Sequence, residues 1–234
     1  MSAPPPDRAP LAPRLPADLR PLGPHDGGHD GDELVWEAVS VIGTPPVTAG
    51  IPPGVALEVT GCRLAGVRIP GADLGPVRIT DTVLERCDLS GAVLGFAALS
   101  RVEFVDCRLS GVVLAGARLA DVRLVSCRLD GASFRMTTGQ HVSFEDCGGE
   151  GADFYGATLA RTRFFDCNLT GADFDRAHLD GARFHGSAME AVTGAGSLRG
   201  VVIDSGQLVP MAVLALAAMG IRIDDDRGPG GSRR

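Results

Sequence analysis

The chain contains no lysine and few aromatic residues. Its 22 basic residues are all arginine, and only 9 Phe, 1 Trp and 1 Tyr occur among 234 residues. With 29 acidic residues the net charge is -7, which argues against a protein that binds nucleic acid or an anionic membrane through a basic surface. Because aromatic residues are scarce, the core must consist mainly of small and medium aliphatic side chains.

Long apolar runs are also missing. The longest spans Leu208–Met219, and it is too short to cross a bilayer, because a membrane-spanning helix needs about 20 apolar residues. The N-terminal stretch is interrupted by prolines and lacks the apolar segment of a secretory signal. We therefore expect a cytoplasmic protein without a membrane partner, in which the six cysteines are reduced.

The composition changes along the chain. Residues 1–31 are rich in Pro, Gly, Asp and Arg and are predicted to form a disordered arm. Residues 32–56 are predicted to form an N-terminal cap and a loop, in which Trp36 covers an open end of the core. The rest of the chain divides into a repeat region over 57–204, a C-terminal capping and dimerisation helix with a short strand over 205–223, and a disordered tail over 224–234.

The repeat region has a period of five. From 64 to 184, every fifth residue is Leu, Ile or Phe at 23 of 25 positions, the exceptions being Gly139 and Gly149. The residue two places before each is Ala, Cys, Val or Thr at all 25 positions. Two inward residues spaced two apart lie on one side of a short extended segment, and the chain must turn before the next pair. Four such segments close a square coil, so that one coil consists of four pentapeptides.

Glycine and cysteine recur once in every four pentapeptides and mark this coil. Glycine at the third position of a turn requires a positive φ, which predicts a type II turn at that corner: Gly71, Gly91, Gly111, Gly131, Gly151 and Gly171. The corner before the cysteines is predicted to be a type I turn and carries Arg86, Asp106, Ser126, Asp146 and Asp166.

Runs such as CRLAGVRIPGADL and CNLTGADF resemble the pentapeptide-repeat family, whose pattern is A-[D/N]-L-x-x. The resemblance covers about 150 of the 234 residues. It implies an all-β protein, a right-handed quadrilateral parallel β-helix of about seven coils with a C-terminal capping α-helix. It also implies a non-enzymatic scaffold that binds a protein partner.

The segment after the repeat is predicted to be helical. Asp204 begins a capping box with Gln207, Pro210 should kink or restart the helix, and Gly220 should end it. The helix is apolar on nearly all sides, so one face can cover the solenoid and the other must meet a partner. A homodimer is the simplest solution, and the resemblance also implies one. The predicted interface is Leu208, Met211, Val213, Leu214, Leu216 and Met219.

The cysteine column is the most conspicuous candidate for chemistry: Cys87, Cys107, Cys127, Cys147 and Cys167. A zinc site is disfavoured because no Cys-x-x-Cys or Cys/His cluster occurs. Disulfides are disfavoured because inward Cβ atoms one coil apart lie about 4.8 Å from each other, beyond the usual separation of about 3.5–4.5 Å. We interpret the column as small buried residues that fill a corner, and we expect no catalytic residue, metal, cofactor or small-molecule substrate.

Function is therefore expected on the outer surface. Residues 57–128 carry 8 acids and 9 arginines, whereas 129–204 carry 11 acids and 6 arginines. The missing large residues at Gly139 and Gly149 are either a local dent or a contact feature. The predicted partner-binding surface is Asp146, Asp153, Asp166, Asp173, Asp175, Tyr155 and Phe165.

The resemblance leaves a second function open. Some members of the family are dimeric rods that mimic duplex DNA and bind DNA gyrase or related topoisomerases, which gives resistance to quinolones or other gyrase poisons. Duplex DNA carries about one charge per 1.7 Å. The repeat region has 19 acids and 15 arginines, a net charge of only -4. A scaffold for another protein partner is therefore favoured over the gyrase-binding alternative.

Overall fold

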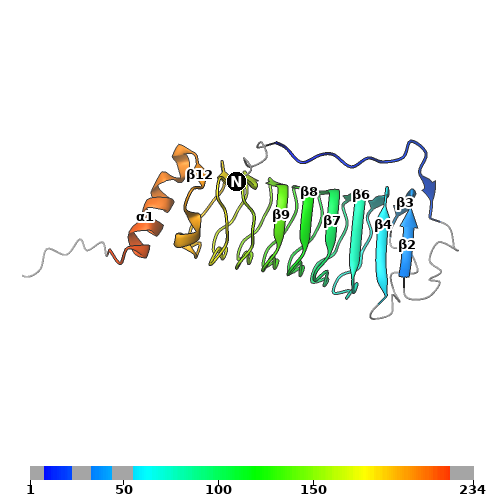
Figure 1. Cartoon of the computed structure of the whole chain (residues 1–234), viewed down its shortest axis with the longest axis horizontal. Coiled ribbons are helices and arrows are strands. Elements are labelled where there is room, and N and C mark those ends of the chain that lie inside the picture. Colours follow the sequence, from blue (N-terminus) through cyan, green and yellow to red (C-terminus); the bar gives the residue numbers. More distant parts are fainter. Residues whose placement is uncertain (1–7, 23–32, 44–54, 222–234) are drawn as a thin grey trace, which may run out of the picture.

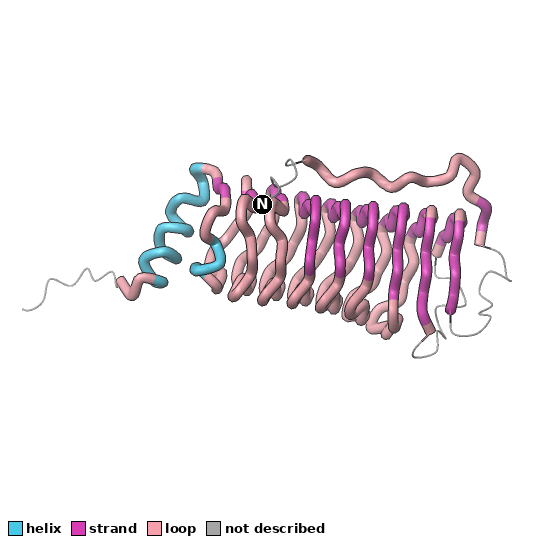
Figure 2. Tube along the Cα trace, viewed as in Figure 1, coloured by secondary structure: helices cyan, strands magenta, loops and turns pink. Residues whose placement is uncertain are grey.

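The computed structural model describes residues 8–22, 33–43 and 55–221. The chain forms a parallel β-solenoid of about eight turns, with one α-helix at its C-terminal end (Figure 1). The predicted fold is confirmed. An extended N-terminal segment runs along one edge of the rod (Figure 2).

The strands of successive turns pair in parallel and form one sheet that winds around the rod. Neighbouring strands are one turn apart in the chain, as expected when the backbone rises by one strand spacing per coil. Their bounds are β1 (Arg20–Pro21), β2 (Glu33–Glu37), β3 (Val39–Ile42), β4 (Ala56–Thr60), β5 (Arg63–Ala65), β6 (Val77–Glu85), β7 (Ala98–Val105), β8 (Arg118–Val125), β9 (Thr138–Glu145), β10 (Arg163–Phe165), β11 (Arg183–Phe184) and β12 (Val202–Ile203).

The pairing register is four pentapeptides through most of the rod. From β6 to β9 each paired residue lies opposite the equivalent residue of the next coil, as Leu99 does with Leu119. The first turn is three residues longer, with Ser40 opposite Arg63. The last turn is shorter by one residue, with Arg183 opposite Val202. The repeat frame therefore slips by one residue between Thr193 and Val202.

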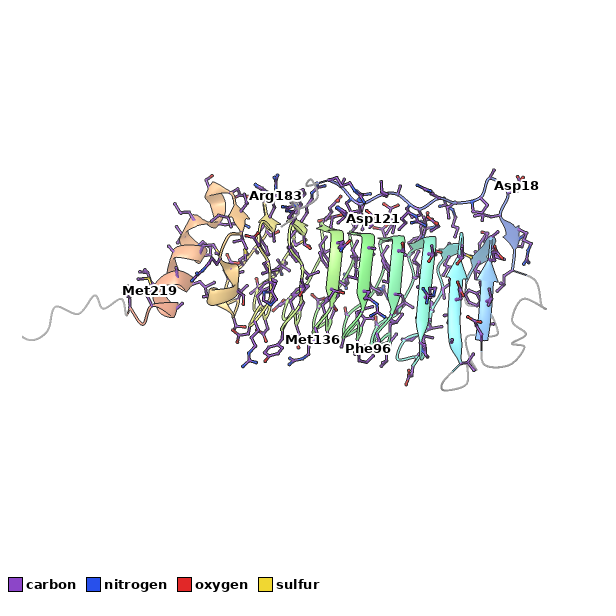
Figure 3. The ribbon with its side chains drawn as sticks, in the orientation of Figure 1. Asp18, Phe96, Asp121, Met136, Arg183 and Met219 are labelled. Atoms are coloured by element: carbon purple, nitrogen blue, oxygen red, sulfur yellow. The ribbon has the colours of Figure 1, made fainter. Side chains whose placement is uncertain are left out.

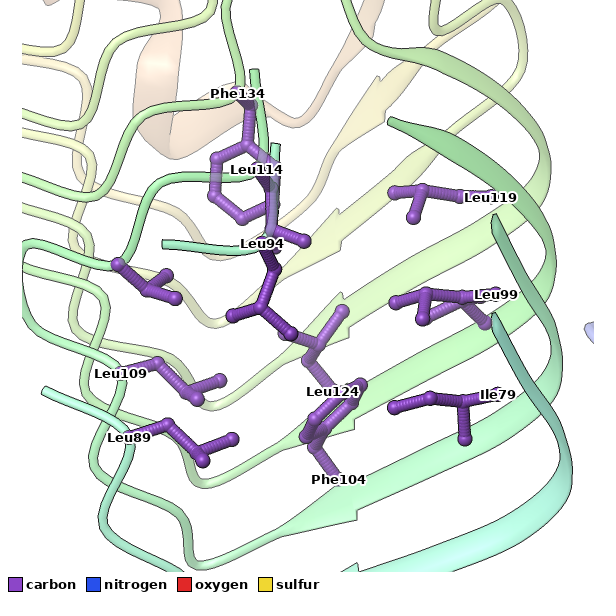
Figure 4. Close-up of a pocket in the computed structure, with 12 residues that line it drawn as sticks. Ile79, Leu89, Leu94, Leu99, Phe104, Leu109, Leu114, Leu119, Leu124 and Phe134 are labelled. Atoms are coloured by element: carbon purple, nitrogen blue, oxygen red, sulfur yellow. The ribbon is translucent and has the colours of Figure 1, made fainter. Parts of the chain in front are cut away.

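The two inward columns of the repeat form the core. All fifty of their positions are buried except Ile69, Ala72 and Gly139, which are partly exposed. Large side chains from the four sides meet along the axis (Figure 4). A cavity of about 20 Å³ left between them is lined by apolar side chains only, among them Leu99 and Leu119. That volume is close to the space one water molecule needs, so this part of the interior has no room for a substrate.

The C-terminal half of the core is built from phenylalanines. Rings one coil apart stack face to face with centroids 4.7–5.0 Å apart. Rings on opposite sides of the rod meet edge to face at 5.5–6.1 Å. The stacking distance equals the spacing of adjacent strands, so the coil itself sets the rings at a favourable separation. The rings are Phe134, Phe144, Phe154, Phe164, Phe174 and Phe184.

The corners differ from the prediction in one respect. The glycine column has φ between 63 and 70, as the type II prediction requires. The prediction of a type I turn before the cysteines is wrong, because φ is also positive there, between 51 and 54, at Arg86, Asp106, Ser126, Asp146 and Asp166. In this conformation the N–H of Asp106 points along the rod and donates to the carbonyl of Val125, 3.0 Å away in the next coil. Short polar side chains such as Asp tolerate left-handed backbone, which explains most of this column.

The N-terminal segment also differs from the prediction. Residues 1–31 are predicted to be disordered, but within this range residues 8–22 are extended and contact the rod. β1 pairs with β3, and the N–H of Leu11 donates to a carboxylate oxygen of Asp121 at 3.0 Å. The prediction overlooked that prolines can order a segment that finds acceptors along a rigid edge. Residues 1–7 and 23–32 lie outside the described residues.

The first turn of the solenoid is formed by β2 and β3. Leu34 and Trp36 point inward and are buried, and Trp36 lies opposite Val59 of β4. The strand-like segment around Trp36 therefore continues the coil instead of closing its end as a separate cap. The loop predicted in this region, residues 44–54, lies outside the described residues.

The C-terminal end is helical. After a short 3₁₀ segment η2 (Ala195–Leu198) and β12, a second 3₁₀ segment η3 (Ser205–Gln207) leads into α1 (Leu208–Ala218). The predicted capping box between Asp204 and Gln207 is present. Pro210 lies in the first turn of α1, which begins at Leu208 after a change of helix type, and Gly220 follows its end with φ 73. None of the helices in the described part of the chain has the length and apolar character needed to cross a bilayer. The predicted tail, residues 224–234, lies outside the described residues.

Gly139 leaves no dent in the rod. It pairs in register with Leu119, and a Cβ atom at Gly139 would lie 2.6 Å from Cδ2 of Leu159 and 2.9 Å from Cγ2 of Val142. At Gly149 a Cβ atom would lie 3.3 Å from Cδ2 of Leu169. Leucines of the next coil thus lean into the spaces that the glycines leave.

We predict that Gly139→Leu, which restores the repeat pattern, lowers the stability by about 1–3 kcal/mol, because Leu159 already occupies the space. Chemical denaturation of the variant and the wild type measures the difference. Adding Leu159→Ala should recover part of the loss, since it vacates the contested volume. A more stable Gly139→Leu protein would contradict this account of the packing.

Candidate interaction surfaces

The cysteine column lies inside the rod and is regular. All five cysteines are buried and free. Each Sγ donates to the carbonyl oxygen of the residue 23 positions earlier, as from Cys107 to Leu84 at 3.4 Å and from Cys147 to Leu124 at 3.5 Å. The hydroxyls of Thr137 and Ser187 make the same contact, at 2.8 and 2.9 Å. Small inward residues of the coil, in the cysteine column and at Thr137, therefore supply donors to carbonyls of the preceding coil.

Burial disfavours the thiolate at Cys62 and at Cys87. Burial raises the pKa of Cys62, which lies outside the column, 25 residues before Cys87, and donates to the carbonyl of Trp36. The neighbouring thiol of Cys107, together with burial, raises the pKa of Cys87. All six thiols are buried, so a reagent cannot reach them unless the coil opens, and they should be chemically inert in the fold.

We predict that a thiol reagent modifies none of the six cysteines of the native protein at neutral pH within an hour, and all six after denaturation. Intact-mass spectrometry counts the added groups. Rapid modification of the native protein, with retained circular dichroism, would show that the column is accessible.

The predicted partner-binding residues divide between two sides of the rod. Asp153 and Asp173 lie opposite each other in adjacent coils, and Asp175 is two residues beyond Asp173 on the same side. Tyr155 belongs to this group and is partly buried, because Arg135 lies 4.3 Å from the centre of its ring and Arg176 5.6 Å.

The charge of this first group is partly neutralised. Arg135 forms an ion pair with Asp153 at 2.9 Å. Asp173 accepts hydrogen bonds from the N–H of Asp175 and the hydroxyl of Thr193. The group is therefore a mixed aromatic and charged surface instead of a plain acidic one.

Asp146 and Asp166 lie at a different corner. Both are exposed, and Asp146 accepts a hydrogen bond from Ser126 at 3.0 Å. Phe165 is next to this corner and is partly buried against the ring of His185, with centroids 5.6 Å apart. The aspartates of the predicted partner-binding surface are thus divided between two edges of the rod.

Ion pairs reduce the charge of the side formed by the second halves of β7 to β9. Arg123 bridges Glu103 and Glu145, with both contacts at 2.6 Å. The two carboxylates raise the pKa of the Arg123 guanidinium. The charges on this side are paired with each other, so the side offers little net charge to a charged partner.

One apolar edge is more prominent than the sequence suggested. Phe96 is 80% exposed and Met136, two coils further along, is 61% exposed (Figure 3). The Phe96 ring lies over Gly116, and the Met136 sulfur lies over Gly156. A large residue followed one coil later by glycine is the sequence signal for such a side chain that lies flat along the rod.

The C-terminal helix is also exposed. Met211 and Leu214 pack against the core, and Leu216 is partly buried. Leu208, Val213 and Met219 are 63, 53 and 73% exposed. One face of α1 therefore covers the last turn and the other presents apolar side chains at the end of the rod.

A coil of four pentapeptides with paired inward columns and four corners defines a β-solenoid repeat protein with a quadrilateral cross-section. A family model described as "Pentapeptide repeat region" matches residues 77–154 and 97–174. Residues 77–174 thus form a pentapeptide-repeat region, as the resemblance of the sequence predicted. No match was found among curated proteins.

Several solved structures are similar in part. A trypsin-treated variant of QnrB1, described as a plasmid-mediated fluoroquinolone resistance protein, has 20% identity, covers 82% of this chain and 97% of its own, and superposes with a TM-score of 0.36. HetL from the cyanobacterium Nostoc sp. strain PCC 7120, involved in heterocyst differentiation regulation, has 16% identity, coverages of 72% and 86%, and a TM-score of 0.30. TM-scores this low support no statement about function.

Proposed function

We propose that the protein is a non-enzymatic scaffold that binds a protein partner through its outer surface. The observation that carries the proposal is the filled interior: both inward columns are occupied by packed side chains, and the cavity between Leu99 and Leu119 holds about 20 Å³. Chemistry on a substrate needs a concave site with convergent polar groups. The outer columns are suited to contact with another rigid surface.

The C-terminal helix is the proposed homodimer interface. Leu208, Val213 and Met219 are exposed on a helix whose opposite face is already packed. An exposed apolar helix at the end of a rod is covered most simply by a two-fold copy of itself. Such a dimer doubles the length of the rod and places the more acidic halves next to each other.

We predict that Val213→Glu converts the dimer into a folded monomer, because it places a charge in an apolar interface without touching the core. Sedimentation velocity at tens of micromolar protein measures the mass. Thr158→Glu adds the same charge to an exposed position on the solenoid and should leave the dimer intact. A wild-type protein that sediments as a monomer would contradict the proposed interface.

The partner surface is proposed to be the two groups described above, around Tyr155 and around Phe165. We predict that Tyr155→Ala and Phe165→Ala each weaken capture of the partner at least about tenfold, since aromatic anchors dominate protein interfaces. Quantitative affinity capture from the host cell, with the variants compared with the wild type, measures the change. Ile42→Ala, at an 88% exposed position in the first turn of the solenoid, serves as control, and unchanged partner profiles would count against these surfaces.

The second candidate is a DNA-mimicking dimer that binds DNA gyrase or a related topoisomerase. The observation in its favour is the exposed acidic corner at Asp146 and Asp166, in the half of the rod that adjoins the dimer helix. Against it, a dimer about 70 Å long would replace about 40 phosphate charges, whereas the two solenoids would carry -4 each. Gyrase supercoiling assays with and without a quinolone decide this alternative, and no effect at micromolar protein would exclude it without affecting the scaffold proposal.

A further inference from the structure

The N-terminal segment lies along a single corner of the solenoid. This corner is the point in β6, β7, β8 and β9 at which each strand bends from one side of the rod to the next (Figures 2 and 3). Its residues have φ between 48 and 56 and are Asp81, Arg101, Asp121 and His141. The segment passes over them in order, with Arg8 near Asp121 and Arg20 at the first turn.

Two aspartates of the corner hold the segment. The guanidinium of Arg8 donates to both carboxylate oxygens of Asp121, at 2.6 and 3.1 Å. The N–H of Leu11 donates to the same carboxylate at 3.0 Å, and the N–H of Arg14 donates to Asp81 at 3.0 Å. These contacts use side-chain carboxylates instead of a β-ladder.

The contacting residues follow a period of three. The segment reads RAP, LAP and RLP over 8–16, so each triplet ends in proline and begins with a residue that contacts the corner or lies over it. A polyproline II helix has three residues per turn and rises about 3.1 Å per residue, which is about 9.3 Å per turn. Leu11 and Arg14, one turn apart, contact carboxylates two coils apart, and two coils rise about 9.6 Å.

The spacing of the aspartates therefore matches the pitch of a polyproline II helix. Aspartate occupies this corner at two positions that lie two coils apart, Asp81 and Asp121, with Arg101 between them. A partner with the strand rise of about 3.3 Å would also reach from one aspartate to the next, but it would turn alternate residues away from the rod. With a period of three, the first residue of every triplet faces the corner.

The two carboxylates are held ready as acceptors. Arg101 donates to both oxygens of Asp81 at 2.6 Å and holds the pKa of that carboxyl below its usual range. Burial opposes ionisation of Asp121, but Arg8 and the N–H of Leu11 outweigh it, and the pKa of Asp121 is also lowered. Both are thus ionised at neutral pH, as a charge-assisted hydrogen bond requires.

The remaining contact is loose. A hollow of about 340 Å³ lies between residues 9–13 and the side chains of Val102, Glu103, Arg123 and Glu145. Further along, the ring of Pro16 lies against Gly61, where a Cβ atom would be only 3.1 Å from its Cδ. The segment is therefore anchored at discrete points instead of being buried along its length.

We propose that the corner formed by Asp81 and Asp121 is a binding track for a polyproline II segment made of x-x-Pro triplets with a leading arginine. Its occupant is residues 8–16 of the same chain. The track recognises the arginine through its bidentate contact to Asp121. It selects a segment of matching pitch because two carboxylates, two coils apart, accept backbone N–H groups one helical turn apart. This binding site is separate from the partner surfaces proposed above.

Hydrogen exchange on the full-length protein tests the occupancy. The amides of Leu11 and Arg14 should exchange slowly in the wild type. Asp121→Asn should speed exchange at Leu11 about tenfold or more, because a hydrogen bond to a charged group is lost. Asp106→Asn, at a corner that the segment does not touch, should change nothing, and circular dichroism verifies that both variants are folded.

A peptide of residues 8–17 tests the recognition. Added to full-length protein that carries Arg8→Asp, whose own segment is weakened, the labelled peptide should bind, as measured by fluorescence anisotropy. Binding should fall at least about tenfold when Asp121→Asn is added to that protein, or when the peptide carries alanine in place of its three prolines.

Three results would overturn the proposal. Fast exchange at Leu11 in the wild type would show that the track is not occupied. An affinity for the peptide that changes neither with Asp121→Asn nor with the loss of the prolines would show that the site recognises neither the charge nor the pitch of the segment. Protection of Leu11 that rises with protein concentration would assign the segment to a second copy of the chain.

Discussion

The hydrogen-bond ladder between successive coils is the constraint on which the rest of the molecule depends. Backbone N–H groups that point along the rod donate to carbonyls of the preceding and of the next coil, at the corners as well as in the strands. At the corners this direction requires a positive φ, which glycine adopts freely and which Asp and Ser tolerate. The corner column predicted to contain type I turns is left-handed for this reason.

Once the ladder sets the rise per coil, identical positions stack at one strand spacing. Phenylalanines then stack at 4.7–5.0 Å, and thiols or hydroxyls of one column reach carbonyls of the preceding coil. Gly139 and Gly149 are tolerated because leucines of the next coil lean into their places. The interior is thereby filled, and interaction is left to the outer columns.

The same rise acts on the outside of the rod. Any outward residue type that recurs in every coil or in every second coil becomes a row of equally spaced groups, of which Asp81 and Asp121 are an example. A rigid segment whose own pitch equals a multiple of the coil rise can bind to such a row, because each of its turns meets one of the equally spaced groups. The N-terminal segment has that property because proline restricts its φ and keeps it extended.

The sequence was sufficient to predict the coil and the inward columns from the pentapeptide pattern, and the capping box at Asp204 from the segment that follows it. These features are local or strictly periodic, so each residue's direction follows from its position in the repeat. The pattern also identified Tyr155 and Phe165 as outward residues, but it did not reveal that Arg135 and His185 partly cover them, because those neighbours lie a whole coil away.

Contacts between segments without a shared period were decided by the tertiary structure alone. Composition indicated disorder for residues 8–22, since the segment has too little apolar surface to fold by itself. It becomes ordered because the folded rod presents carboxylates at a spacing that exists only after the coils have stacked. A sequence pattern records which residues recur, whereas the distance between Asp81 and Asp121, and the partner it selects, arise from the three-dimensional rise of the solenoid.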